Sequence, residues 1–507
     1  MDESLSASVV DWVLDAVTEL TATDWAPATT HRGINVGDVL FGALFEAALR
    51  AARGEDAASL RRLATPAFSS RVASRLKRLR ADWQCRAGAQ EISRADVLLW
   101  PRLPTHTRQQ IPVARQLLVQ DVGMLFVACQ SRIGIELKGA GLPYVDGHRA
   151  FQAQIARGRA SAIHVAECLD APVSVRSRLP GSQAGPDALV DVLRTVIRAQ
   201  APVAREAIEI AEAALLQSGA KVLVVGNDLT TEGRAGALVA TKLGRHSISH
   251  MHGAIGSPAH RGRVVDEYHV FGPADKSWLE DLSVRKVNRR AVVCGAPYLD
   301  SVPQRRDRID QLIAHKAGIR RAASAVLIMT SGPGGKVSFK HHLEMIRALR
   351  VLSKEFPDTA FVAKLHPKDR EAYYLLPETQ VPGARITVIP ATAGDIPRDV
   401  FHWFHGFSAL ITGASTSAKE AMLVGLPVIS VDLHNQLSDI DFIRAGATHH
   451  AQSGAGLSDA VRAALCPESH APIRKRAIKY LKQCYFGLDG QSAARSASRI
   501  VDLCPSS

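Results

Sequence analysis

Small polar residues and glycines follow one apolar run in the second half of the chain. Ser331 and Gly332 begin the segment SGPGGK, directly after AVLIMT. Glycines let a backbone approach a phosphate closely, and the free amides of such a turn can bind it. Thr330 stands where a Walker loop has its first glycine, and Val337 stands where a dinucleotide fingerprint has its third. The segment therefore predicts either a phosphate-binding loop of neither type or a plain strand-to-helix turn.

Two basic side chains end the next apolar run, FVAKLHP. Lys364 lies within this run, and His366 precedes Pro367, a residue that suits the first position of a helix. An imidazole at the end of a strand can donate a hydrogen bond to a phosphate oxygen. We expect Lys364 and His366 to bind an anion, with a purely structural role for the histidine as the alternative.

Three hydroxyl residues follow the run ALITGA. They are Ser415, Thr416 and Ser417, and the acidic Glu420 comes three positions after the last of them. Hydroxyls at the start of a helix can hold a phosphate, and Glu420 can bind a ribose. The alternative needs no ligand, because Ser417 and Glu420 also fit the S/T-x-x-E capping box.

In the first half of the chain, the run HSISHMHG carries His250 and His252 at the end of an expected strand. A neutral histidine there can take a proton from a hydroxyl, so we predict His252 as a general base. Other polar candidates nearby are Asn227, Asp228 and Asp266. A zinc site built from the histidines is a weaker alternative, because no third ligand stands at metal-like spacing.

These residues all follow short apolar runs that alternate with longer amphipathic stretches, a pattern typical of βαβ units with parallel sheets. The sequence predicts an α/β protein of two doubly wound Rossmann-like domains, with a helical N-terminal extension and a C-terminal helix. We place the extension at residues 1–88, the domains at 89–305 and 306–471, and a helical segment at 472–507. A long helix is expected from about 186 to 217.

Composition narrows the class of protein. The 507 residues are 46% hydrophobic and 22% charged, as in soluble globular proteins, and no run is long and apolar enough to span a membrane. The acidic, polar start of the chain does not resemble a signal peptide, so we expect a cytoplasmic protein. The seven cysteines form no CxxC pair, which argues against disulfides and zinc.

The net charge of +13 favours an anionic partner. A basic cluster at residues 71–80 suits either peripheral contact with the inner face of the membrane or a solvated helix surface. An aromatic content of 5%, without basic runs that carry interleaved aromatics, argues against nucleic acid.

Taken together, the motifs resemble those of GT-B glycosyltransferases, in particular capsular polysialyltransferases and CDP-glycerol glycerophosphotransferases. The motifs that carry the resemblance are His252-Gly253, Cys294 to Pro297, His366-Pro367, the stretch from Glu420 to Pro427, and Asp489-Gly490 with Ser492 and Arg495. The resemblance covers roughly residues 220–500. Met251 stands where the family has glutamine before its His-Gly pair.

This resemblance implies that His366, Ser415, Thr416 and Ser417 hold the donor phosphate, and that His252 is the base acting on the acceptor. It implies a metal-independent, inverting transferase without a cofactor. Such an enzyme moves a sugar or polyol phosphate from a CMP-, CDP- or UDP-activated donor to an anionic glycan or lipid-linked acceptor of a bacterial surface polysaccharide. A sugar-nucleotide 2-epimerase and a non-catalytic polysaccharide- or polyanion-binding scaffold are the alternatives.

Overall fold

The computed structural model describes residues 3–52, 90–162, 165–173, 179, 186–253, 258–282, 290–302, 308–319, 324–333, 338–366, 369–391, 399–413, 415–435, 437 and 440–504. The chain divides into two compact units, and each is described by itself. Unit 1 comprises Met1–Asp300 and Phe486–Ser507, and unit 2 comprises Ser301–Tyr485. The basic cluster at residues 71–80, the glycines and lysine at 334–336, and Pro367 lie outside the described residues.

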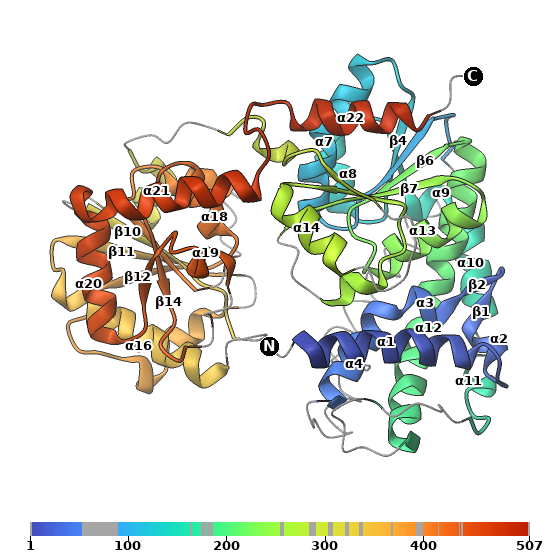
Figure 1. Ribbon diagram of the computed structural model, residues 1–507, viewed down its shortest axis with the longest axis horizontal. Helices are drawn as coiled ribbons and strands as arrows, with labels where there is room; N and C mark the ends of the chain where they lie inside the picture. The colour runs from blue at the N-terminus through green and yellow to red at the C-terminus, as the bar shows by residue number, and fades with distance from the viewer. Residues whose placement is uncertain are drawn as a thin grey trace. The chain divides into compact units, whose positions relative to one another are not determined.

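Unit 1 is built on a parallel sheet (Figure 1). Within the described residues its strand order is β5-β4-β3-β6-β7-β8-β9. The strands are β3 (Val97–Trp100), β4 (Met124–Ala128), β5 (Tyr144–Asp146), β6 (Val222–Val225), β7 (His246–His250), β8 (Glu267–Val270) and β9 (Arg290–Val293). Strand order reverses between β3 and β6, which confirms a doubly wound sheet.

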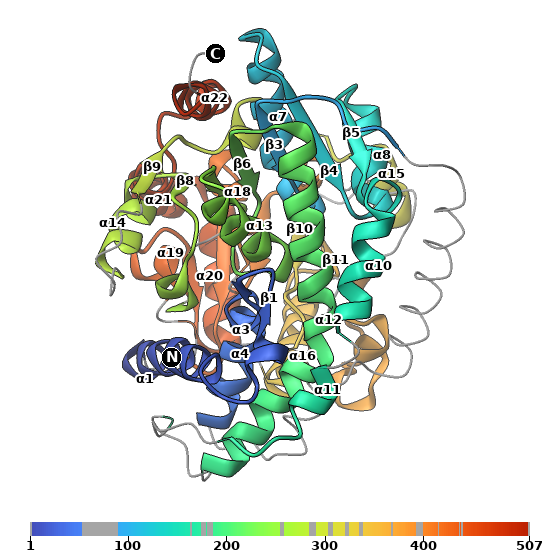
Figure 2. The same cartoon turned by 90° about the vertical axis from the view of Figure 1, so that its right-hand side faces the viewer.

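Helices cover both faces of this sheet. They are α7 (Pro104–Val119), α8 (Ser131–Gly139), α9 (Gly147–Ala150), α10 (Gln152–Ser161), α11 (Val165–Cys168), α12 (Pro186–Ser218), α13 (Thr231–Lys242), α14 (Pro273–Asp281) and α22 (Ser492–Asp502). Alternate strand residues such as Val97 and Leu99 pack with α7, α8 and α22 in one core. The long helix α12 lies against α10 and α13 (Figure 2), and its bounds confirm the helix expected at 186–217.

The described part of the N-terminal extension belongs to unit 1. It contains α1 (Glu3–Leu20), α2 (Ala26–Thr29), α3 (Val36–Val39) and α4 (Phe41–Ala52), together with a two-stranded hairpin of β1 (Thr30–His31) and β2 (Ile34–Asn35). The helices agree with the expectation from sequence, whereas the hairpin was not expected. Its strands of two residues each are too short to show an alternating pattern.

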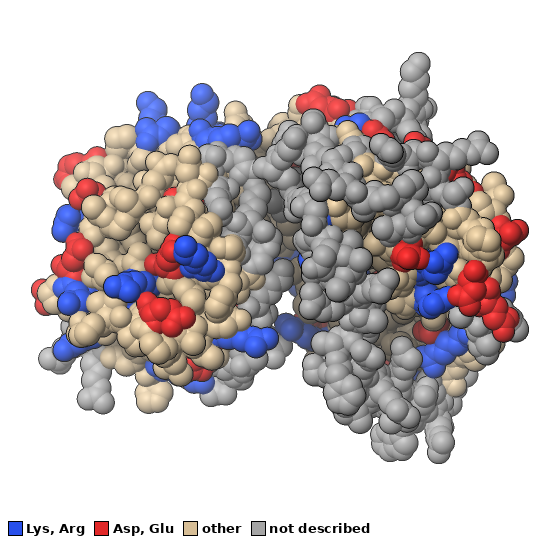
Figure 3. Space-filling view, turned by 90° about the horizontal axis from the view of Figure 1, so that it is seen from below, with Lys and Arg blue, Asp and Glu red and all other residues tan. Residues whose placement is uncertain are grey.

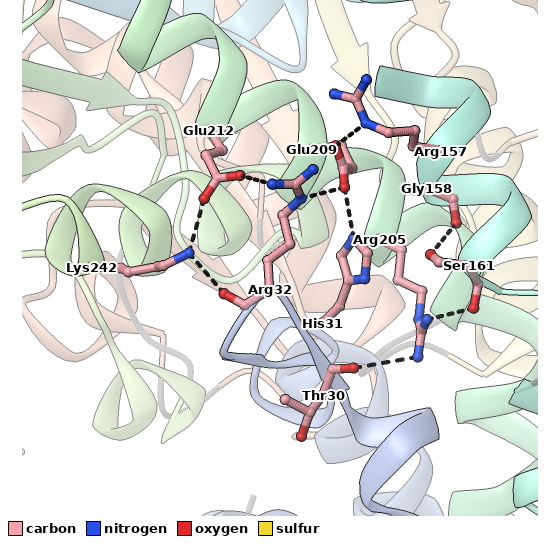
Figure 4. Close-up of polar contacts among 10 residues, drawn as sticks. All are labelled: Thr30, His31, Arg32, Arg157, Gly158, Ser161, Arg205, Glu209, Glu212 and Lys242. Atoms are coloured by element: carbon pink, nitrogen blue, oxygen red, sulfur yellow. Dashed lines mark hydrogen bonds and ion pairs between the residues drawn. The ribbon is translucent and has the colours of Figure 1, made fainter. Parts of the chain in front are cut away.

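A polar cluster fastens this hairpin to α12 (Figure 4). The buried Glu209 accepts hydrogen bonds from Arg32 at 2.5 Å and from Arg157 of α10 at 3.3 Å, and its carboxylate lies 3.1 Å from His31 Nε2. One turn earlier, the buried Arg205 donates to the carbonyl oxygens of Pro27 and Ser161. Charged groups of α12 thus hold the extension against the domain.

The C-terminal helical segment divides between the two units. α21 (Pro467–Cys484) belongs to unit 2, while α22 packs on the sheet of unit 1. Asp300 caps α22 by accepting from the amides of Ser492 and Ala493, and Arg495 donates to the Cys294 carbonyl. Two of the motifs that carry the family resemblance therefore contact each other, and in this structure both hold the end of the chain in place.

Unit 2 contains a second parallel sheet, of order β12-β11-β10-β13-β14-β15 in the described residues. Its strands are β10 (Ser324–Met329), β11 (Thr359–Lys364), β12 (Ile386–Ile389), β13 (Ala409–Thr412), β14 (Val428–Val431) and β15 (His449–Ala451). The runs AVLIMT, FVAKLHP and ALITGA correspond to β10, β11 and β13, and the fold class is confirmed.

The helices of unit 2 are α15 (Gln311–Lys316), α16 (Phe339–Glu355), α17 (Val400–Phe404), α18 (Ser417–Leu423), α19 (Asp441–Arg444), α20 (Gly454–Leu465) and α21. Apolar residues of α16 and α20, among them Ile346 and Val461, pack on one face of the sheet. α18 contacts α17 and α21 and begins after β13.

On the face drawn in Figure 3, the described Lys and Arg side chains are interspersed with Asp and Glu. Among the described residues, none of the helices combines the length and the apolar character that crossing a membrane would require.

Candidate functional site

A pocket lies at the carboxyl edge of the sheet of unit 2, where strand order reverses. From β10 the chain proceeds to β11 and β12 on one side, and then to β13 on the other. Loops after β10, β13 and β14 line the pocket together with α16, and it encloses about 530 Å³, its open mouth included. Ligands of doubly wound sheets bind at this kind of position. The topology thus marks the pocket as the candidate binding site of unit 2.

Ser331 and Gly332 line this pocket directly after β10. Gly332 has a φ of +67°, a left-handed conformation that glycine adopts without steric cost. The turn therefore brings backbone rather than side chain to the pocket wall. This placement agrees with a close approach of a ligand to the backbone, although no ligand is needed to form such a turn.

Histidines form part of the pocket wall, and the sequence analysis did not single them out. His341, in the first turn of α16, stacks on His434 with ring centroids 3.5 Å apart. His434 Nε2 also lies 2.5 Å from a Glu344 carboxylate oxygen. Asp432, the first residue after β14, accepts a hydrogen bond from the Leu437 amide at 2.9 Å. Aromatic and polar groups therefore share one wall of the pocket.

Lys364 and His366 stand at the end of β11, next to the loop that follows β10. The His366 amide donates to the Thr330 hydroxyl at 3.1 Å, which ties the two loops together. The Lys364 ammonium lies 5.4 Å from the centre of the Trp403 ring. Burial lowers the pKa of Lys364, and the Glu420 carboxylate offsets part of this effect. Lys364 and Glu420, predicted separately, are thus electrostatically coupled.

The three hydroxyl residues lead into α18. Thr416 occupies the N-cap position without a capping hydrogen bond from its side chain, and Ser417 is the first helical residue. The Ser417 hydroxyl donates to the Ser415 hydroxyl at 2.7 Å. The capping box considered for Ser417 and Glu420 does not form, because the helix begins one residue too early for it. The Ser417 amide instead donates to the Ser415 hydroxyl at 3.3 Å, so Ser415 satisfies one amide at the start of the helix.

These predicted donor-site residues do not all meet in one pocket. Of the predicted residues, Ser331 and Gly332 line the pocket. Gly413, which was not predicted, also lines it and stands two residues before Ser415. Lys364 is the last residue of β11 and His366 follows two positions later, whereas Glu420 lies in α18, the helix that follows β13. The structure thus groups them along one edge of the sheet rather than within a single cavity.

A buried histidine–aspartate pair, which the sequence did not predict, lies beside this edge of the sheet. His342 Nε2 lies 2.9 Å from an Asp369 carboxylate oxygen, and both side chains are almost fully buried. Burial alone would raise the pKa of Asp369, but the hydrogen bonds from His342 and Thr330 lower it. The pair attaches Asp369, which follows β11, to α16. This attachment helps to position His366, three residues earlier.

In unit 1, His252 follows β7 at the carboxyl edge of the sheet. Its Nδ1 lies 3.0 Å from the Gly226 carbonyl after β6, so this nitrogen carries the proton and donates. Nε2 of the neutral ring is then the basic nitrogen. Burial lowers the pKa of His252, the Gly226 carbonyl raises it, and His260 lowers it further, with a net decrease. His252 is consequently neutral at pH 7 and able to accept a proton.

The other candidates of unit 1 are engaged elsewhere. His250 Nε2 lies 3.2 Å from the Ser496 hydroxyl of α22. Asp228 is fully buried and accepts from the Val264 amide and from the Tyr268 hydroxyl. Asp266 accepts from both the amide and the hydroxyl of Ser247. These side chains hold strands and helix together, so they are poor alternatives to His252 as a base.

Zinc was considered for the histidines of unit 1. Within the part of the chain that the structure describes, no group of three or more His, Cys, Asp or Glu side chains is arranged to hold a metal ion.

Comparisons with known proteins support the fold. No protein-family model matches the chain, and no curated protein sequence is significantly similar to it. A solved structure of MnaA from S. aureus with UDP has a TM-score of 0.50 and 15% identity, over 80% of this chain and 97% of that one. A Listeria monocytogenes protein assigned as a UDP-N-acetylglucosamine 2-epimerase has a TM-score of 0.53 and 14% identity, over 80% and 96%. The calicheamicin glycosyltransferase CalG4 has a TM-score of 0.47 and 15% identity, over 81% and 98%.

Similarity at this level of identity establishes the architecture alone. The chain has the GT-B type of fold, with two Rossmann-like domains.

Proposed function

We propose that the protein is a GT-B glycosyltransferase. It moves a sugar or polyol-phosphate unit from a nucleotide-activated donor to a hydroxyl of a bacterial surface or capsular polysaccharide. The observation that carries the proposal is the state of His252: Nδ1 is committed to the Gly226 carbonyl, and Nε2 is left as a neutral base. A transferase needs such a base to deprotonate its acceptor.

In this proposal, unit 2 binds the donor. The nucleotide lies along the carboxyl edge, its phosphates near Ser331, Gly332, Ser415, Thr416 and Ser417. Lys364 and His366 supply positive charge and hydrogen-bond donors to the phosphate that leaves. Glu420 binds a ribose hydroxyl and keeps Lys364 charged, since its carboxylate raises the pKa of that lysine.

The reaction forms one bond and breaks one. His252 Nε2 accepts the proton of the acceptor hydroxyl while the oxygen attacks the activated centre of the donor. The bond from that centre to the nucleotide phosphate oxygen breaks, and the nucleotide leaves with the electron pair. A single displacement of this kind inverts the configuration of a sugar donor. The proposal uses no cofactor.

A sugar-nucleotide 2-epimerase is the second candidate. Two similar structures, with TM-scores of 0.50 and 0.53, are one solved with UDP and one assigned as a UDP-N-acetylglucosamine 2-epimerase. An epimerase would bind the same class of nucleotide sugar in unit 2 but would require no acceptor. Dependence on an acceptor therefore separates the two functions.

The test pairs donor binding with turnover. Wild type, His366→Ala, His252→Ala and the control His315→Ala, an exposed histidine of unit 2, are titrated with CMP-, CDP-, UDP- and GDP-sugars. We expect His366→Ala to weaken binding of the preferred donor about tenfold, as the loss of about 1.5 kcal/mol of a charge-assisted hydrogen bond implies. His252→Ala should bind normally and lose at least 100-fold in rate with acceptor present. Product formed without acceptor would favour the epimerase.

A further inference from the structure

A second histidine, His106, stands beside His252, and the proposed function does not use it. His106 lies in the first turn of α7, after β3, and is 1% exposed. Its Nδ1 accepts a hydrogen bond from the Arg102 amide at 3.1 Å, so in the neutral ring the proton is on Nε2. That Nε2 is buried without a hydrogen-bond partner in the described structure. A buried donor left unpaired costs about 1–3 kcal/mol, so its retention calls for an explanation.

Three strand ends meet at this histidine. The rings of His106 and His252 lie 4.5 Å apart edge to face, with their planes at 63°. Gly226, whose carbonyl accepts from His252, has no room for a side chain, because a Cβ there would lie 2.1 Å from the His106 ring. His106 therefore packs at once against the ring of His252 and against the residue that orients it.

The charged groups around the pair favour neutral rings. Burial chiefly lowers the pKa of His106, to about 3, with smaller effects of His252 and Arg102. Arg102 itself is paired with Glu232 at 3.1 Å. His260, which precedes β8 in the chain, lowers the pKa of His252. A protonated His106 would oppose protonation of His252, whereas a neutral one leaves His252 free to take up a proton.

We propose that His106 is a positioning residue that holds the His252 ring with Nδ1 toward the Gly226 carbonyl and Nε2 available as the base. The proposal rests on the proposed function for the role of His252, but the orientation itself does not depend on activity. An imidazole suits the position better than a phenyl ring, since it also accepts the Arg102 amide. The hydrogen bond from the Arg102 amide and the ring contact with His252 hold His106 in place, and the His106 ring explains why residue 226 is a glycine.

The test reads the His252 ring directly, without substrate. Nitrogen-15 NMR of histidine-labelled full-length protein reports which ring nitrogen carries the proton and at which pH the ring titrates. In wild type we expect His252 to show Nδ1–H alone and to titrate below its unperturbed pKa of about 6.5. In His106→Ala we expect both tautomers and a titration that moves up toward 6.5. His106→Phe, which retains a ring, should restore the single tautomer.

Two controls keep the result interpretable. His246→Ala removes a histidine at the opposite end of the same strand and should leave the His252 signals unchanged. If His106→Ala fails to fold, His106→Asn retains an acceptor near the Arg102 amide but lacks the ring, and it should release His252 in the same way. Unchanged His252 signals in a folded ring-less variant would overturn the proposal.

Kinetics separate this proposal from the proposed function. Where transfer is measurable, His106→Ala should lower kcat with little change in the KM for donor, and it should shift the acidic limb of the pH profile to higher pH. Absence of transfer in wild type would refute the proposed function, while the NMR result would still decide the role of His106.

Discussion

Glu209 offers a sharp test of how the N-terminal extension is attached, because its carboxylate joins the hairpin and α10 to α12 (Figure 4). Glu209→Gln preserves the shape of the side chain and removes its charge. Breaking a fully buried ion pair costs about 3–5 kcal/mol. Here the partner side chains of Arg32 and Arg157 are 38% and 52% exposed and can turn to water. We therefore expect a smaller loss, about 2–3 kcal/mol.

The loss should appear as local opening of the hairpin. Hydrogen exchange of peptides spanning residues 27–39 measures this opening without unfolding both units. A loss of 2–3 kcal/mol corresponds to exchange about 30- to 140-fold faster. Glu206→Gln is the matched control, since Glu206 lies one turn earlier on α12 and pairs with Arg159 rather than with the hairpin. Its effect on this peptide should be less than about twofold.

The effect should also depend on pH in one direction. Burial alone would raise the pKa of Glu209, but the hydrogen bond and charge of Arg32 lower it overall. The carboxylate therefore stabilises the fold above its unfolded pKa of about 4.3, and this stabilisation disappears as pH falls through the lowered value. The difference in hydrogen-exchange rate of the hairpin between wild type and Glu209→Gln should therefore decrease at acidic pH. Equal exchange of the hairpin in both proteins at pH 7 would refute the reasoning.

Two further predictions concern the sheet and the end of unit 1. Gly295→Ala forces a side chain at a φ of +89° and within 2.4 Å of the Ser492 hydroxyl, whereas Gly318→Ala meets a φ of +64° and open space. Limited proteolysis should cleave α22 from the protein faster in Gly295→Ala than in wild type, and Gly318→Ala should show no such change. Gly295→Ala should also lower Tm more than Gly318→Ala does. Equal decreases in Tm would mean that the contact with α22 is unimportant. Burial alone would raise the pKa of Glu267, but the neighbouring His269, 3.8 Å away, and the hydrogen bond from Arg499 lower it to about 2. Glu267→Gln should lower the urea midpoint at pH 7, and this decrease should become smaller toward pH 2.5. The reason is that the carboxylate stabilises the fold above about pH 4.3 and loses this effect as it is protonated. A decrease that stays constant with pH would contradict the lowered pKa of Glu267.

The sequence predicted the architecture well wherever a segment had enough residues to show a period. α12 and the strands β7, β10, β11 and β13 appear where the apolar patterns place them. β5 and β15, with three residues each, were missed, because so short a run shows no alternation. The two-residue strands of the N-terminal hairpin escaped for the same reason.

The site was predictable only as far as strand ends could be located. Residues such as Ser331 and His366 follow strands, so topology places them at one edge. The partnership of His342 with Asp369 and that of His106 with His252 depend on packing between distant elements. No spacing in the sequence encodes such contacts. His106 in particular lies on a helix of mixed polarity, so its sequence does not distinguish a buried histidine from an exposed one.

The central claim, that the carboxyl edge of unit 2 binds a nucleotide-activated donor, is tested most directly by a thermal-shift panel. CMP, CDP, UDP, GDP and their sugar conjugates are compared on wild type and on His366→Ala. A ligand at 100 times its Kd stabilises the folded state by about 2.7 kcal/mol, which raises Tm measurably. We expect one nucleotide class to raise Tm in wild type and to raise it less in His366→Ala. No shift with any nucleotide, in protein shown to be folded, would contradict it.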